Sequence, residues 1–269
     1  FKQKTAYEML RSLVGSEMCI RDRVYTASFL GYATHGLLDA CTSYGTQLFW
    51  PFSDQRVAWN NISIVDPLFT IPIIILTVTA IKTRKKMFSF FAIGWITFYL
   101  FLGFMQYERT LSAAMELAYS RGHEAERLTL KPSFGNLILW KSIYQHDGIY
   151  FVDAIRTVYS STWCSGDSIK RFDFNYHIPS VDKDSQQARD IERFRWFSQD
   201  YLGYDEKNDL VTDIRYSMIP NQIAPMWGLV IDKKLSMDKH ASWWTSQSLD
   251  QSQLKLFKEM LSGEVCEDF

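Results

Sequence analysis

PLFTIPIIILTVTAI (residues 67–81), KTRKK (82–86) and MFSFFAIGWITFYLFLGFM (87–105) form the stretch of sequence that decides the fold. At about 1.5 Å per residue, the second apolar run forms a helix about 28 Å long, close to the thickness of a bilayer's hydrocarbon core. The first run covers about 22 Å, so it must include its polar first turn or lie in thinned bilayer. The stretch therefore predicts an integral membrane protein with two clear transmembrane helices.

The turn between the two apolar runs contains four basic residues within KTRKK (82–86). Basic residues beside membrane helices stay on the cytoplasmic side. The outer ends of both helices then lie on the opposite face. We therefore expect a multi-pass protein whose loop 40–65 and C-terminal residues 106–269 are external.

Upstream of these runs, VYTASFLGYATHGLLDACTSYG (residues 24–45) predicts a third helix, which carries a polar motif. A loop rich in Pro, Ser, Asp and Asn follows at 51–63, and Asp66-Pro67 is a helix start, with Asp as the N-cap. Residues 1–23 differ, because charge recurs and no signal-peptide pattern is present. Their string SLVGSEMCIRDR (12–23) resembles translated adapter sequence, so we expect residues 1–23 to be non-native.

Residues 106–269 predict a soluble α+β domain with an antiparallel sheet, and residues 24–105 a membrane domain. The predicted strands alternate apolar and polar residues between turn signals, as hairpins require. The expected strands are 137–145, 148–159, 210–219 and 226–232, and the expected helices are 106–122, 185–201 and 250–261.

Composition excludes several classes of function. The net charge of the chain is −1, and its C-terminal part is mildly acidic, which argues against a nucleic-acid partner because phosphate binding needs clustered Lys and Arg. Cys19, Cys41, Cys164 and Cys266 form no C-x-x-C pair, so we expect neither a zinc ribbon nor a disulfide framework. No nucleotide-binding loop, G-x-S-x-G elbow or H-E-x-x-H helix is present.

His35-Gly-Leu-Leu-Asp39 is the sharpest chemical feature. Positions i and i+4 share one face of a helix, so an imidazole nitrogen and a carboxylate oxygen can converge on a divalent metal. Ionisable residues inside an apolar segment usually face an ion, a partner or a cavity. Asp66 is the second candidate ligand. We predict a metal site at His35, Asp39 and Asp66, with zinc favoured for mixed His and Asp ligands and manganese or magnesium as alternatives.

Each candidate also has a structural explanation. His35 and Asp39 can form a helix-packing pair, and Asp66 can serve only as an N-cap, although a carboxylate has two oxygens and can do both. The remaining histidines have no acidic or Cys partner at ligand spacing, so we interpret them as surface or strand-end residues: His123, His146, His177 and His240. Asp213 and Arg215 are expected to form an ion pair on one face of a strand.

The run HGLLDACTSYGTQLFWPFSDQRVAWNNISIVDPLF (35–69) resembles the core motif of a family of bacterial inner-membrane, metal-dependent hydrolases that is also described as LexA-binding. The later elements Pro132–Trp140 and Asp213–Tyr216 are similar to elements of the same family. That family also carries an upstream His-Arg-x-x-Thr-His element, which is absent here. The resemblance therefore implies a fragment truncated at its N-terminus.

The resemblance implies a membrane-bound hydrolase in which a metal-bound water attacks the substrate; no catalytic side chain is assigned. A site beside the bilayer suggests membrane lipid as a partner and a lipid-like ester or phosphoester as substrate. The alternative is a non-enzymatic membrane protein with a structural His35/Asp39 pair and an external domain that binds a protein partner.

Overall fold

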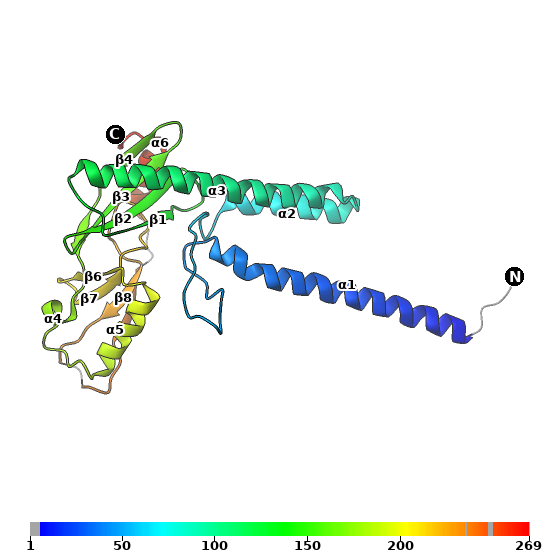
Figure 1. The fold of residues 1–269 in the computed structure, drawn as a ribbon, viewed down its shortest axis with the longest axis horizontal. Coiled ribbons are helices and arrows are strands. Elements are labelled where there is room, and N and C mark those ends of the chain that lie inside the picture. Colours follow the sequence, from blue (N-terminus) through cyan, green and yellow to red (C-terminus); the bar gives the residue numbers. More distant parts are fainter. Residues whose placement is uncertain (1–5, 235, 247–249, 269) are drawn as a thin grey trace. The chain divides into compact units, whose positions relative to one another are not determined.

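The computed structural model describes residues 6–234, 236–246 and 250–268. The chain divides into two compact units, the first ending at Trp59 and the second beginning at Asn60. Figure 1 shows the helices and strands of both units.

The first unit consists of one long helix and a hairpin-like loop. Helix α1 (Ala6–Ala40) contains residues 24–40 of the predicted motif-bearing helix, ends before its last five residues and extends it toward the N-terminus. It ends where the Thr42 hydroxyl donates to the Asp39 carbonyl at 2.8 Å. The loop then returns to the helix, because the Trp59 amide donates to the Ala40 carbonyl at 2.7 Å. The loop is thereby tied to the C-terminal end of α1.

The second unit begins with two antiparallel helices, α2 (Pro67–Thr83) and α3 (Met87–Ser120), which lie side by side (Figure 1). Within the described residues, only α3 is both long and apolar enough to cross a membrane. Helix α2 has 17 residues and is about 26 Å long, short of the roughly 30 Å hydrocarbon core. The prediction of two clear transmembrane helices is therefore supported for α3 alone.

Helix α3 also joins two segments that the sequence predicted as separate helices, 87–105 and 106–122. Its apolar half carries exposed side chains such as Phe91 and Phe101, whereas its second half buries Ala113 and Ala114 against Trp140. One continuous helix therefore connects the apolar hairpin to the sheet domain.

Gly103 of α3 allows the segment before α2 to approach the helix closely. A Cβ atom at this position would lie 2.3 Å from the Asn61 carbonyl oxygen. We expect Gly103→Ala to lower the free energy of unfolding by about 1–3 kcal/mol, because the backbone must move to admit the methyl group. Chemical denaturation of the full chain in detergent micelles measures this loss.

Gly94→Ala is the matched control, since the same helix offers a position with nothing within 4 Å of the added Cβ. It is expected to be neutral or slightly stabilising, because alanine has the higher helix propensity. Equal destabilisation by both substitutions would contradict the close contact at Gly103.

The first sheet of the domain is antiparallel and packs against α3. Strands β2 (Leu139–His146) and β3 (Ile149–Thr157) confirm two predicted strands and are joined at Asp147-Gly148, both with positive φ. This conformation suits a tight hairpin turn that follows the twist of the strands. The other strands are β1 (Arg127–Pro132), β4 (Ser161–Cys164), β5 (Ser168–Lys170) and β10 (Glu267–Asp268), and the order is β1-β2-β3-β4-β10 with β5 beside β3.

A second antiparallel sheet has the order β6-β7-β8-β9. Its core joins the sheet to α5 (Gln186–Phe197) through Ile191, Phe194 and Val211. The remaining elements are α4 (Phe174–His177), β6 (Leu202–Asp205), β7 (Leu210–Asp213), β8 (Trp227–Val230), β9 (Ser242–Thr245) and α6 (Gln251–Ser262). The predicted helical region followed by an antiparallel α+β domain is confirmed, with two sheets in the domain.

Two of the cysteines form a bond that was not predicted from the sequence. Cys164 of β4 and Cys266 are disulfide-bonded across 102 residues of sequence, and α6 packs beside them through Met260. The sequence did not predict this single disulfide, because widely spaced cysteines show no pairing until the sheet brings β4 and β10 together.

Candidate metal site at His35 and Asp39

His35 and Asp39 lie one turn apart on the same face of α1. The His35 Nε2 atom is 3.4 Å from the Asp39 Oδ2 atom, and the side chains are 70% and 49% exposed. This distance exceeds the usual range of an N–H···O hydrogen bond, roughly 2.7–3.2 Å. Two ligands that bind a tetrahedral metal at about 2.0–2.1 Å are themselves about 3.3–3.4 Å apart. The separation of the two side-chain atoms therefore matches that of two ligands of one ion.

The loop after α1 braces the turn that carries this pair. A Cβ atom at Gly36 would lie 3.6 Å from the Leu48 side chain, so Leu48 packs beside the residue that follows His35. The Thr42 hydroxyl and the Trp59 amide hold the end of the same turn through the Asp39 and Ala40 carbonyls. The backbone that positions both side chains is thus fixed by bonds within the first unit.

Asp66 lies in the second unit, where it caps α2. Its Oδ1 atom accepts a hydrogen bond from the Phe69 amide at 3.2 Å, which confirms the predicted N-cap. Its Oδ2 atom accepts one from the Tyr99 hydroxyl at 2.8 Å. Asp66 is buried, and it joins α2 to α3. Its metal role remains a prediction.

Two ligands are fewer than a stable site needs. Protein zinc sites use at least three protein ligands, with a fourth position open in catalytic ones. Across residues 6–234, 236–246 and 250–268, no three His, Cys, Asp or Glu side chains cluster as a metal site would require. His35 and Asp39 alone do not make up such a cluster, and their role as metal ligands remains a prediction.

A polar cluster at the end of α3 was not predicted from the sequence. Arg121 donates two hydrogen bonds to Asp153, at 2.7 and 2.8 Å, and a third to the Tyr144 hydroxyl. That hydroxyl lies 2.9 Å from Nδ1 of His123, whose ring stacks on His146. Burial, followed by the positive charges of His146 and Arg121, lowers the pKa of His123.

His123 and His146 therefore belong to a network that includes the buried Asp153. His146 is the last residue of β2, as expected of a strand-end histidine, but its contact with His123 was not predicted. The one available signal was the alternation of Tyr144 and His146, which places both on the same face of β2.

Lys141 on β2 is a second unpredicted feature. It is buried, and its Nζ atom donates to the Ser217 hydroxyl at 2.7 Å and to the Gln222 carbonyl at 2.8 Å. Both acceptors are neutral. Burial lowers the pKa of Lys141 to about 7, although the negative charges of Asp213 and Asp167 act in the opposite direction. Lys141 therefore changes between its charged and neutral forms near physiological pH.

A groove of about 970 Å³ lies along α5. Aromatic side chains line it, and basic residues outnumber the acidic Glu192. Such a surface suits an acidic or aromatic partner, because complementary charges orient two proteins as they approach each other. The lining residues that carry this character are Phe174, Trp196, Phe197, Lys183, Arg189 and Arg193.

Residues 7–110 of the chain match the family model described as YdjM inner membrane protein. This range contains His35, Asp39, Asp66, all of α2 and most of α3, while both sheets lie outside it. No curated protein and no solved structure matches the chain. The match supports an inner-membrane location and similarity to an inner-membrane family; the hydrolase activity, the metal and the N-terminal truncation remain predictions.

Proposed function

We propose that this chain is a membrane-bound, metal-dependent hydrolase whose His35 and Asp39 side chains hold a divalent ion. The observation that carries the proposal is the 3.4 Å separation of His35 Nε2 and Asp39 Oδ2, with both side chains exposed. A divalent ion lowers the pKa of a bound water and polarises an ester or phosphoester oxygen. The role of the two side chains is to hold the ion at a fixed point on α1.

The donor set favours zinc. An imidazole nitrogen and a carboxylate oxygen are both common zinc ligands, whereas magnesium and manganese prefer sites made of oxygens. Asp66 is proposed as a third ligand, because a carboxylate that accepts two hydrogen bonds retains further lone pairs. The substrate class proposed is a lipid-like ester or phosphoester, since the matched family is an inner-membrane family.

Metal content tests the proposal directly. Full-length protein is purified in detergent, loaded with zinc, dialysed and analysed for bound metal. We expect His35→Ala and Asp39→Ala to weaken zinc binding by roughly tenfold or more, as loss of a ligand should cost at least as much as loss of its supporting groups.

His240→Ala is the matched control. His240 also pairs with an aspartate, Asp190, but its Nδ1 atom is 3.0 Å from each carboxylate oxygen, as in a hydrogen bond. This variant should bind as much zinc as the unmodified protein. Equal zinc content in all four proteins would overturn the metal proposal.

We also propose that α2 is a second membrane span and that the sheet domain lies on the external face. The basic turn between α2 and α3 favours this orientation under the positive-inside rule. The Cys164–Cys266 disulfide supports it independently, because structural disulfides persist in oxidising compartments and are rare in the cytosol.

Thiol trapping in cells tests this orientation. After alkylation before lysis, the full chain is expected to migrate differently on gels with and without reductant, because the disulfide closes a loop of 102 residues. Cys164→Ser and Cys266→Ser should abolish the difference, whereas Cys41→Ser should preserve it. Complete alkylation of Cys164 and Cys266 in unreduced cells would place the domain in a reducing compartment and contradict the proposal.

The second candidate is a non-enzymatic membrane protein whose domain binds a protein partner. The groove along α5 favours it, since basic and aromatic side chains gather there. Under this alternative, the metal content of the protein does not depend on His35 or Asp39. The zinc measurement therefore separates the two candidates.

A further inference from the structure

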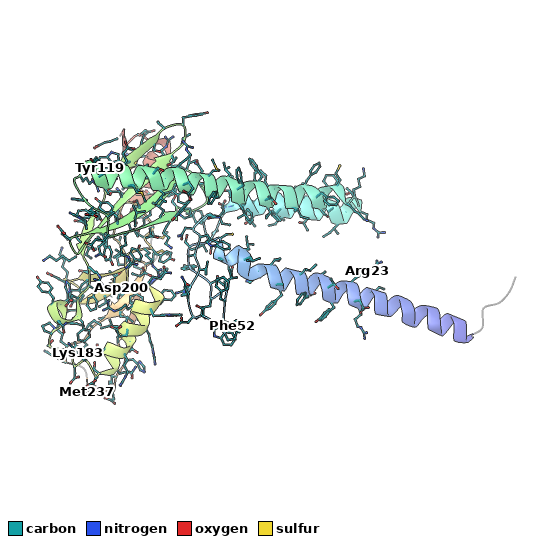
Figure 2. All side chains as sticks on the ribbon, viewed as in Figure 1. Arg23, Phe52, Tyr119, Lys183, Asp200 and Met237 are labelled. Atoms are coloured by element: carbon teal, nitrogen blue, oxygen red, sulfur yellow. A yellow bond between two sulfur atoms is a disulfide. The ribbon has the colours of Figure 1, made fainter. Side chains whose placement is uncertain are left out.

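The loop after α1 has an apolar tip, Leu48-Phe49-Trp50-Pro51-Phe52 (residues 48–52), in which Leu48 is partly buried and the aromatic side chains are exposed. The side chains of Phe52, Trp50 and Phe49 are 96%, 70% and 56% exposed, and Phe52 stands at the outer end of the loop (Figure 2). No charged residue occurs between Asp39 and Asp54. Large apolar side chains gathered on a surface mark an interaction site, whereas single exposed ones are ordinary.

The backbone of the loop holds the tip in this conformation. Thr46 and Val57 exchange two backbone hydrogen bonds of 2.9 Å, which close the base of the hairpin. The Arg56 guanidinium donates to the Tyr44 and Gly45 carbonyls at 2.7 and 3.2 Å. The Phe49 carbonyl accepts bonds from the Phe52 and Ser53 amides, which form the turn itself. The aromatic side chains therefore remain outside, where an apolar medium can cover them.

The segments next to the tip indicate that this apolar medium is the lipid bilayer. Helix α1 also presents exposed apolar side chains, including Phe29, Leu30 and Leu37. The loop lies within the range that matches an inner-membrane family. Tryptophan is enriched where hydrocarbon meets headgroups, because its ring is apolar and its N–H is polar. The polar residues Asp54, Gln55 and Arg56 follow directly, so apolar tip and polar base are separated along the loop.

We propose that residues 48–52 insert into the interfacial layer of the lipid bilayer, with Trp50 and Phe52 among the acyl chains and residues 54–56 at the headgroups. The loop is thus a lipid anchor built on a hairpin. Because Leu48 packs beside Gly36, the anchor also fixes the depth of the α1 turn that carries His35 and Asp39. The insertion depends on the loop alone and holds whether or not that pair binds a metal.

An environment-sensitive dye on the tip tests the proposal. Full-length protein carrying Cys19→Ser and Cys41→Ala, with Cys164 and Cys266 kept as the disulfide, receives Phe52→Cys and is labelled with a nitrobenzoxadiazole dye. It is reconstituted into vesicles of phosphatidylethanolamine and phosphatidylglycerol. We expect blue-shifted emission and at least twofold stronger quenching by lipids with a spin label on the acyl chain than at the control position.

The control is Gln55→Cys, an exposed polar position three residues further along the same loop. Phe49→Cys provides a second tip position, should Phe52→Cys fail to fold as judged by gel filtration and circular dichroism. A polar environment at both tip positions, equal to that at position 55, would overturn the proposal. Blue-shifted emission without quenching by spin-labelled lipid would also overturn it, since a protein partner or a second copy of the chain would then cover the tip.

Discussion

Asp213→Ala is expected to lower the free energy of unfolding by about 3–5 kcal/mol. This is the cost of removing one partner of a buried ion pair and leaving the other charge unpaired. Asp213 and Arg215 are both almost completely buried, and the guanidinium donates to the carboxylate at 2.9 and 2.7 Å. Arg215 also donates to the Phe197 carbonyl and the Gln199 side chain. Without Asp213, these neutral partners cannot compensate a buried positive charge. Chemical denaturation of the full chain in detergent micelles measures the loss.

Two further variants make this result specific. Glu259→Ala removes the half-buried partner of the exposed Lys255 on α6, and helix pairs of this i,i+4 spacing contribute about 0.3–0.5 kcal/mol. The double substitution Asp213→Leu with Arg215→Met removes both buried charges, so it should recover most of the stability lost by Asp213→Ala. If Asp213→Ala cost no more than Glu259→Ala, the ion pair would have no structural role.

The stability of the protein is expected to rise between pH 7 and pH 9.5 because of Lys141. Its pKa is about 7 in the folded protein and 10.5 for an ordinary lysine. Below pH 7 the amine is charged in both states, and the folded state bears the full cost of burying the charge. Between the two pKa values the unfolded state binds one more proton, so stability increases by about 1.4 kcal/mol per pH unit. Above both values the amine is neutral in both states and the cost disappears.

Lys141→Met isolates this contribution, since methionine retains an unbranched side chain without a charge. Denaturation curves collected from pH 7 to 9.5 should have a smaller slope of stability against pH in this variant than in the unmodified protein. Lys255→Met, which removes an exposed lysine of α6, should leave the slope unchanged. Identical slopes in all three proteins would mean that Lys141 is charged throughout this range.

The elements predicted best from the sequence are those whose signals are local. The Asp66 cap, the Asp147-Gly148 turn and the alternation along β2 and β3 depend on residues close together in the chain, and the structure contains each of them. The convergence of His35 and Asp39 is of the same kind, because the helix alone brings i and i+4 together. Local geometry was sufficient for these features.

The features missed depend on contacts distant in sequence. The apolar run ends at residue 105, and a separate helix was predicted from residue 106. Instead, the helix continues. Gln106 donates to the carbonyls of Leu137 and Thr157, and Arg109 donates to those of Val158 and Tyr159. The polar residues are therefore satisfied inside a continuous helix. The disulfide and the Tyr99 partner of Asp66 were missed for the same reason.

The predicted strand 210–219 ends early for a local reason. The Arg215 amide donates to the Asp213 carboxylate at 3.1 Å, which turns the backbone out of the sheet immediately after β7. The predicted ion pair is confirmed, although it forms at a turn and not along a strand. A side chain that bonds its own backbone competes with the strand ladder.

The continuity of α3 makes the domain sensitive to the bilayer in a mechanical sense. Its 34 residues form a rod about 51 Å long, and the half from residue 106 onward contains no Gly or Pro at which a helix readily kinks. Hydrophobic mismatch changes the tilt of a membrane helix. Any tilt that a thinner or thicker bilayer imposes on the apolar half must therefore swing the sheet packed on Ala113 and Ala114 through the same angle. A change in membrane thickness is therefore expected to change the orientation of the domain relative to the bilayer.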